Sequence, residues 1–115
     1  MNMEQYLKSN DQEPIVSSLL DEDPELLELV TKFVERLPEQ LSDINDAVKE
    51  NNWAELKRKV HDLKGLGGNF GFPVISQVAK QIEDEIRAQS FTNIPPLLQE
   101  LNSLYQRIRL GQNNP

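Results

Sequence analysis

The chain contains no cysteine, which excludes disulfides, thiolate chemistry and cysteine-ligated metal sites. It has no run approaching the roughly 18 apolar residues of a membrane span, and its N-terminus lacks the basic and apolar regions of a signal peptide. Positive charge is scarce, since the formal net charge is −7, whereas nucleic-acid binding generally needs a basic stripe. We therefore expect a cytoplasmic protein that binds neither nucleic acid nor membrane.

Glycine and proline are infrequent and strand-like alternation is missing, so the fold class should be all-α. At 115 residues the chain can bury one core, which makes it a single domain and excludes large multi-part enzymes. We expect residues 1–22 to form an N-terminal segment with a short helix, its first 12 residues partly mobile. Residues 23–111 should form an antiparallel up-down four-helix bundle. The initial Met and the polar C-terminal tail favour a free-standing protein over a piece of a larger kinase.

Local signals predict where the first helices begin. Pro14 suits the first turn of a short helix that runs to about Leu20. Asp23 can cap free N–H groups and Pro24 tolerates the first helical position, so a long helix should begin there. Its apolar spacing continues through Pro38, which predicts a kink rather than a break.

The later boundaries carry similar signals. Asn52 and Glu55 have the spacing of a capping box and should begin the third helix. Gly71 can supply the left-handed residue that ends it. Residues 92–96 form a turn into the last helix, and Gly111 marks its end.

The only histidine of the chain, His61, should face water from the middle of the third helix. An apolar stripe at helical spacing predicts the inward face of that helix. Its members are Trp53, Leu56, Val60, Leu63, Gly67 and Phe70. At roughly 100° per residue, His61 points about 130° away from the centre of this stripe. The same exposed face carries Lys57, Lys64, Gly65 and Gly68.

Charge is distributed unevenly around this histidine. Residues 11–50 hold twelve acidic and three basic side chains, a net charge of −9, whereas residues 57–64 have a net charge of +3. A basic island therefore surrounds His61 in an otherwise acidic chain.

The pattern His-x-Leu-Lys-Gly at residues 61–65, followed by Gly71 ten residues after the histidine, resembles the histidine-containing phosphotransfer (HPt) domain family. The resemblance covers nearly the whole chain. It implies a phosphocarrier of a two-component phosphorelay, whose His61 exchanges a phosphoryl group with aspartates of receiver domains and which has no kinase activity. The implied partners are receiver domains of response regulators and of hybrid sensor histidine kinases. The carrier is expected to be a monomer without a cofactor, and the receiver supplies Mg²⁺.

Residues around His61 fit roles in such a transfer. The ammonium of Lys64, one turn away, can offset the roughly −1.5 to −2 charge of a phosphoryl group. Lys57 and Arg58 can attract an acidic receiver pocket, and Gly65 and Gly68 leave a path for a docking partner. The alternatives are solvated surface lysines and arginines, and glycines used for helix packing. Gly71 is expected to be structural.

Three residues on or near the fourth helix complete the candidate site. Glu83 lies 22 residues after His61, where some members of the resembled family have a glutamine that orients the histidine. Its carboxylate can accept the Nδ1–H and leave Nε2 as the nucleophile, yet its charge would repel a phosphoryl group, so a plain solvated glutamate is the alternative. Lys80 is expected on the same flank. Phe72 is expected to stay partly exposed in an apolar docking patch, or else to anchor the loop.

Two other classes of function compete with the carrier. A helical adaptor without phosphotransfer would bind a partner helix in a groove and would need no histidine at this position. A di-iron bundle needs at least two histidines, and only one is present. A hydrolase needs a nucleophile held by a base, and no such local pattern occurs.

Overall fold

The computed structural model describes residues 13–113, in which four long helices dominate and no strand occurs. These helices are α3 (Leu27–Lys49), α4 (Trp53–Asn69), α5 (Pro73–Arg87) and α6 (Ile94–Asn113). One-turn helices precede α3 and α6, namely α2 (Leu19–Glu22), η1 (Pro24–Leu26) and η2 (Phe91–Asn93). The all-α prediction is confirmed. The predicted mobility of residues 1–12 lies outside the described residues.

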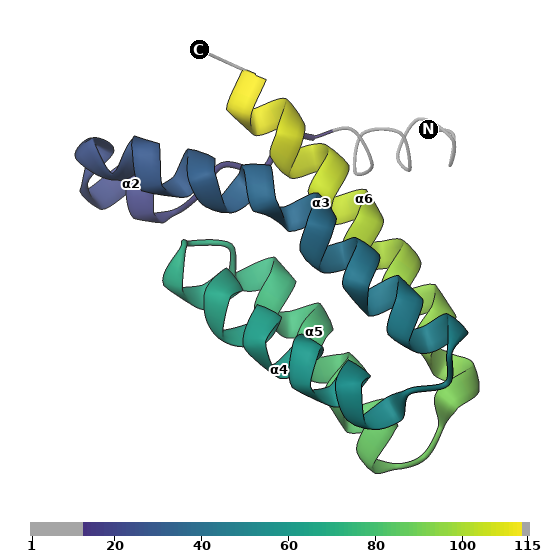
Figure 1. Ribbon diagram of the computed structural model, residues 1–115. Helices are drawn as coiled ribbons and strands as arrows, with labels where there is room; N and C mark the ends of the chain where they lie inside the picture. The colour runs from purple at the N-terminus through teal and green to yellow at the C-terminus, as the bar shows by residue number, and fades with distance from the viewer. Residues whose placement is uncertain (1–12, 114–115) are drawn as a thin grey trace, which may run out of the picture.

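The four long helices form the predicted antiparallel bundle. Short connections reverse the chain between successive helices, so that α3 and α6 form one layer and α4 and α5 the other (Figure 1). Each helix contacts its neighbour in the chain, and α6 returns to contact α3. None of the helices in the described range is both long and apolar enough to cross a membrane.

The start of α3 follows the signals in the sequence. The side chain of Asp23 accepts a hydrogen bond from the backbone N–H of Glu25 at 3.1 Å, and Pro24 occupies the first position of η1. The helix continues through Pro38 without interruption. Leu37 and Leu41, on either side of the proline, both remain buried, so the same face of the helix stays turned to the core. Figure 1 shows that α3 bends partway along its length, as a proline inside a helix predicts.

A short N-terminal helix is present, as predicted, but its predicted bounds, from Pro14 to about Leu20, are wrong. Residues 13–17 are not helical, and the one-turn α2 begins only at Leu19. The backbone of this segment instead bonds to distant elements: Ile15 N–H donates to the carbonyl of Arg107 at 3.0 Å, and Ser18 N–H donates to that of Gly71 at 2.9 Å. Donors used in this way are not available to a local helix. We call residues 13–18 the N-terminal strap.

The prediction that Gly111 ends the last helix is also wrong, because α6 continues to Asn113. Gly111 is buried, and a Cβ at this position would run into the carbonyl group of Ile15. The glycine therefore lets the strap approach α6 closely, rather than ending the helix.

A buried serine fastens the strap to the turn between α4 and α5. Ser17 is 1% exposed. Its hydroxyl donates to the carbonyl of Phe70 at 2.6 Å and accepts from the N–H of Leu19 at 3.1 Å. The strap thus ties the C-terminal half of α6 to the α4–α5 turn.

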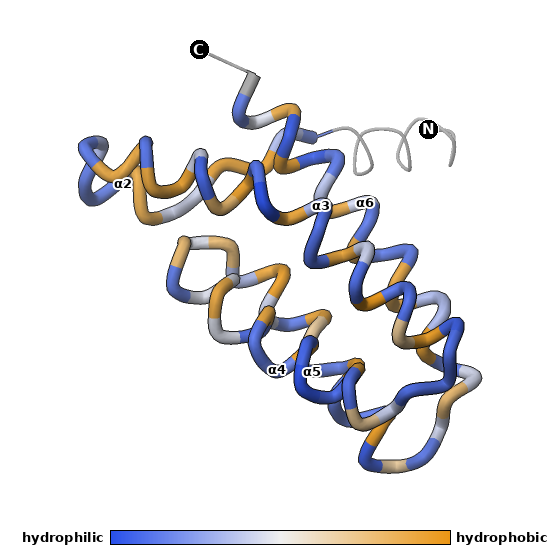
Figure 2. The backbone as a smooth tube through the Cα atoms, viewed as in Figure 1, coloured by the Kyte–Doolittle hydropathy of each residue, from blue (hydrophilic) through white to orange (hydrophobic). Residues whose placement is uncertain are grey.

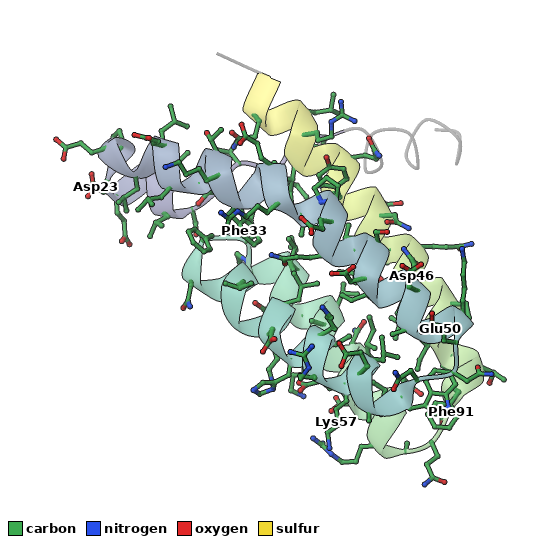
Figure 3. All side chains as sticks on the ribbon, in the orientation of Figure 1. Asp23, Phe33, Asp46, Glu50, Lys57 and Phe91 are labelled. Carbon is green, nitrogen blue, oxygen red and sulfur yellow. The ribbon has the colours of Figure 1, made fainter. Side chains whose placement is uncertain are left out.

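The core lies between the two helix layers, and aromatic pairs close both ends. Apolar and polar residues alternate along every helix, as Figure 2 shows, so that each contributes one face. Phe33 lies between α3 and the α4–α5 pair (Figure 3), stacked on Phe70 at 4.9 Å and on Phe72 at 5.8 Å between ring centroids. Trp53 and Phe91 stack at 4.2 Å at the other end.

Replacing Gly71 with Ala should destabilise the bundle. Gly71 has φ +82°, as predicted for the residue that ends this helix, and an added Cβ would meet the hydroxyl of Ser17 and the backbone nitrogens of Ser18 and Leu19. A strained left-handed residue costs about 1–3 kcal/mol, so the free energy of unfolding should fall by at least that much in urea denaturation.

Gly65→Ala is the matched control. A Cβ at Gly65 meets nothing within 4 Å, and alanine is favoured over glycine in a helix by about 1 kcal/mol. This variant should be as stable as the wild type or more so. Equal stability of Gly71→Ala and wild type would contradict the role assigned to the strap.

Candidate functional site

His61 lies in the middle of α4 and faces water, as the helical phase predicts. Its side chain is 67% exposed, whereas Val60 and Leu63 of the same helix are buried in the core. Asn52 begins the helix with its side chain, which accepts from the N–H of Glu55 at 3.2 Å. The position of this cap and the apolar phase together fix which face of α4 carries the histidine.

The neighbouring helix α5 places a buried carboxylate under the histidine. Glu83 is 9% exposed. Its Oε2 lies 2.9 Å from Nδ1 of His61, and its Oε1 lies 2.6 Å from Nζ of Lys64. One carboxylate therefore bridges two side chains of α4, one turn apart. This is the contact to Nδ1 that the sequence predicted as possible for Glu83.

The charge state of Glu83 decides which nitrogen of His61 carries the proton. Burial disfavours the ionised carboxylate, but hydrogen bonds from Lys64 and His61, together with their charges, lower the pKa of Glu83 below its ordinary value. The ionised carboxylate only accepts hydrogen bonds. Nδ1 is therefore the protonated nitrogen, and Nε2 of the neutral ring keeps its lone pair.

Close packing of α4 and α5 sets the register that brings these groups together. Gly67 is buried, and a Cβ there would meet side-chain atoms of Ile75 and Ser76 at 3.0 Å. The hydroxyl of Ser76 donates to the carbonyl of Lys64 at 2.5 Å. Glu83 follows Ser76 by seven residues, or about two helical turns, so both lie on the face of α5 that meets α4. The role of Ser76 was not predicted, although its seven-residue spacing to Glu83 in the sequence places both on one helix face.

The two glycines of the exposed face differ in their surroundings. Gly65 borders open space, so the surface beside His61 carries no obstructing side chain. Gly68 is exposed too, but a Cβ there would contact the hydroxyl oxygen of Ser76 at 3.5 Å. Gly68 therefore lies next to the α4–α5 packing contact as well as on the open face.

Apart from half-buried Lys64, the predicted basic residues are exposed, and two of these exposed residues pair with acidic neighbours. Lys57 projects away from the bundle, one turn before His61 (Figure 3). Arg58 contacts Glu55 at 2.6 Å and Asp62 at 3.9 Å, and the hydrogen bond from Arg58 lowers the pKa of Glu55. Lys80 of α5 lies 3.3 Å from Asp84. The guanidinium of Arg58 is thus already engaged.

The expectation that Phe72 is partly exposed is wrong. Phe72 is 0% exposed, because Phe33 stacks on its ring and the side chain belongs to the core. In this position it takes no part in a docking surface. The other reading, in which it anchors the connecting loop, agrees with its burial.

Apolar surface near the site lies instead in an open groove between α3 and α4, of about 310 Å³. We call it the α3–α4 groove; it is lined by Leu29, Lys32, Phe33, Arg36, Gln40, Leu66 and Phe70. Leu29 is 52% exposed. The groove could not be predicted from the sequence, because its lining comes from two helices and periodicity does not show which of their residues lie side by side.

A helical bundle with one exposed histidine, held by a buried carboxylate of the next helix, is a histidine-presenting module. The chain belongs to the Hpt family, since the model of the Hpt domain matches residues 28–111. Members of this family are phosphotransfer intermediates rather than kinases, and they interact with receiver domains. Neither the curated proteins nor the solved structures that were compared give a match.

Replacing Glu83 with Gln should change how stability depends on pH. The pKa of Glu83 is lowered from its ordinary value of 4.5, so the ionised carboxylate contributes stability above about pH 4.5, and this is lost as pH falls through the folded-state value. Below about pH 4.5 the wild type should lose up to about 1.4 kcal/mol per pH unit more than Glu83→Gln. Urea denaturation between about pH 3 and 7 measures both slopes, and parallel curves would contradict the bridge.

Proposed function

We propose that this chain is a histidine phosphocarrier of a two-component phosphorelay. Nε2 of His61 accepts a phosphoryl group from an aspartate of one receiver domain and passes it to an aspartate of another. The observation that carries this proposal is the exposed ring whose Nδ1 is held by buried Glu83, at 2.9 Å. This contact orients the ring and leaves Nε2 as the nucleophile.

Lys64 supplies the positive charge that the transfer needs. A phosphoryl group adds a charge of roughly −1.5 to −2, and Glu83 adds another negative charge close by. The ammonium of Lys64 lies 2.6 Å from Oε1 of Glu83 and follows His61 by one turn, so it offsets the carboxylate and is within reach of the phosphoryl oxygens. In this proposal the repulsion expected between Glu83 and a phosphoryl group is reduced by the ion pair.

The receiver domain brings the remaining chemistry. In this proposal the carrier acts as a monomer, holds no cofactor, and meets Mg²⁺ only in the acidic pocket of the receiver. Lys57 and Lys80, both exposed, add to the positive field around His61 and favour encounter with such a pocket.

We propose that the receiver docks astride α4, over His61 and the α3–α4 groove together. Viewed down the helix, Gly65 lies about 40° and Leu66 about 140° from His61. The exposed surface between the histidine and the groove carries Gly65 and the Arg58–Asp62 ion pair. The groove offers exposed Leu29 as an apolar anchor. Its cationic rim, Lys32 and Arg36, complements an acidic partner.

His61→Gln should abolish phosphoryl acceptance and leave the fold intact. The amide of Gln can still donate to Glu83, and exposed substitutions usually change stability by less than about 0.5 kcal/mol. Acid-labile phosphate after incubation with a phosphorylated receiver is the measurement, and Glu100→Gln, exposed on α6, is the control that should accept normally. Acceptance by His61→Gln would refute the carrier; a wild type that binds receivers but gains no phosphate would favour the adaptor.

Leu29→Glu should weaken receiver binding, because it places a negative charge in the anchor position of the groove. A central apolar contact contributes more than about 1–2 kcal/mol to a typical interface, so the dissociation constant should rise by about tenfold or more. Leu110→Glu is the matched control, since Leu110 is 45% exposed on α6 and lies outside the groove. Isothermal titration measures both; equal effects of the two variants would place the docking surface elsewhere.

A further inference from the structure

Glu83 carries a charge that orientation of the histidine alone does not require. Among the described residues it is the buried ionisable side chain, and both of its oxygens are in use, one by His61 at 2.9 Å and one by Lys64 at 2.6 Å. A neutral amide oxygen would also accept the Nδ1–H and hold the ring. The negative charge is therefore available, beside its pairing with Lys64, to act on a state of His61 in which the ring is a cation.

Phosphorylation creates such a state. When Nε2 of a neutral Nδ1–H ring attacks the phosphorus of an aspartyl phosphate, the N–P bond forms from the Nε2 lone pair. The O–P bond breaks, and its electron pair leaves with the aspartate carboxylate. The ring becomes a cation that still carries its Nδ1 proton. In the onward transfer an aspartate oxygen attacks phosphorus, the O–P bond forms, the Nε2–P bond breaks, and its electron pair returns to Nε2. With the proton in place the ring leaves as neutral imidazole. Without it the ring leaves as imidazolate, a far stronger base and a far poorer leaving group.

We propose that Glu83 is a positioning residue that keeps the proton on Nδ1 of phosphorylated His61. Because the proton is retained, the phosphohistidine stays ready for transfer, and is therefore short-lived, above neutral pH. The inference rests on the proposed function, because it concerns the phosphorylated form of His61. A free imidazole is half deprotonated near pH 6.5, so a carrier working above that pH gains from a carboxylate that stabilises the ring cation.

The surrounding charges leave this task to Glu83. Six other ionisable side chains belong to this part of α4 and α5: Lys57, Arg58, Asp62, Lys64, Lys80 and Asp84. Two acidic groups among them are matched by cations, since Asp62 lies 3.9 Å from Arg58 and Asp84 lies 3.3 Å from Lys80. From α3, Asp43 contacts Lys59. Lys64 also bonds to Glu83, which keeps the carboxylate ionised and the proton on the ring.

The test compares the pH profiles of wild type and Glu83→Gln in the full chain. Both are phosphorylated with potassium phosphoramidate, and phosphohistidine loss is followed between about pH 6 and 9, with and without a receiver domain. For each unit by which the pKa of the Nδ1 proton falls in the phosphorylated ring, hydrolysis of the phosphohistidine and transfer to the receiver both become about tenfold slower at alkaline pH. Glu83→Gln should therefore hold its phosphate about tenfold longer at pH 8 and transfer it correspondingly more slowly, while the two proteins converge near pH 6.

Glu85→Gln is the matched control, because it removes one negative charge from the same helix at a residue that accepts from Asn93 instead. Its profile should follow the wild type. Coincident profiles for Glu83→Gln and wild type would overturn the inference. Failure of every receiver to exchange phosphate with His61, while phosphoramidate still phosphorylates it, would instead overturn the proposed function.

A spectroscopic measurement needs no substitution. The ¹⁵N shift of Nδ1 in the phosphorylated wild type should report a bound proton to higher pH in the folded chain than in the same chain in urea. Equal titration midpoints in the two states would overturn the inference, whether or not Glu83→Gln folds.

Discussion

The close contact between α4 and α5 is the constraint on which the rest of the structure depends. Gly67 has no side chain where Ile75 and Ser76 approach, so the two helices come near enough for a side chain of one to bond to the backbone of the other. The hydroxyl of Ser76 then fixes the register at the carbonyl of Lys64. A slide of either helix would separate Glu83 from His61, since both of its contacts are shorter than 3 Å.

The contact between α4 and α5 explains how the carboxylate of Glu83 is held beside His61, the proposed phosphoryl acceptor. The carboxylate of Glu83 is removed from water and shared between two donors, so its charge acts on the ring and on Lys64 rather than on the open surface. On the surface beside His61, Lys57 is exposed and Gly65 has no side chain, while Asp62 and Asp84 are paired with cations. The imidazole of His61 thus has the negative charge of Glu83 on its buried side and a positively charged lysine on its exposed side.

Periodicity predicted most of the fold, because the buried face of each long helix recurs every three or four residues. It also placed His61 on the outer face, whereas Glu83 was expected beside it from the resemblance to the HPt family. Periodicity says nothing about contacts between distant segments. Gly111 and Phe72 were therefore misjudged, since what covers them is the strap and Phe33. The α3–α4 groove was missed for the same reason, because it exists only where two helices meet.

The N-terminal strap packs against the helices of the family domain, although it lies outside the segment that the family model matches. The family match begins at residue 28, whereas Ser17 and Ser18 bond to the turn at Phe70 and Gly71. Ile15 in turn closes against Gly111 at the far end of the chain. The packed unit of this protein is therefore longer than the segment that the family model matches. The hairpin that presents the histidine owes part of its rigidity to residues that lie outside the family signature.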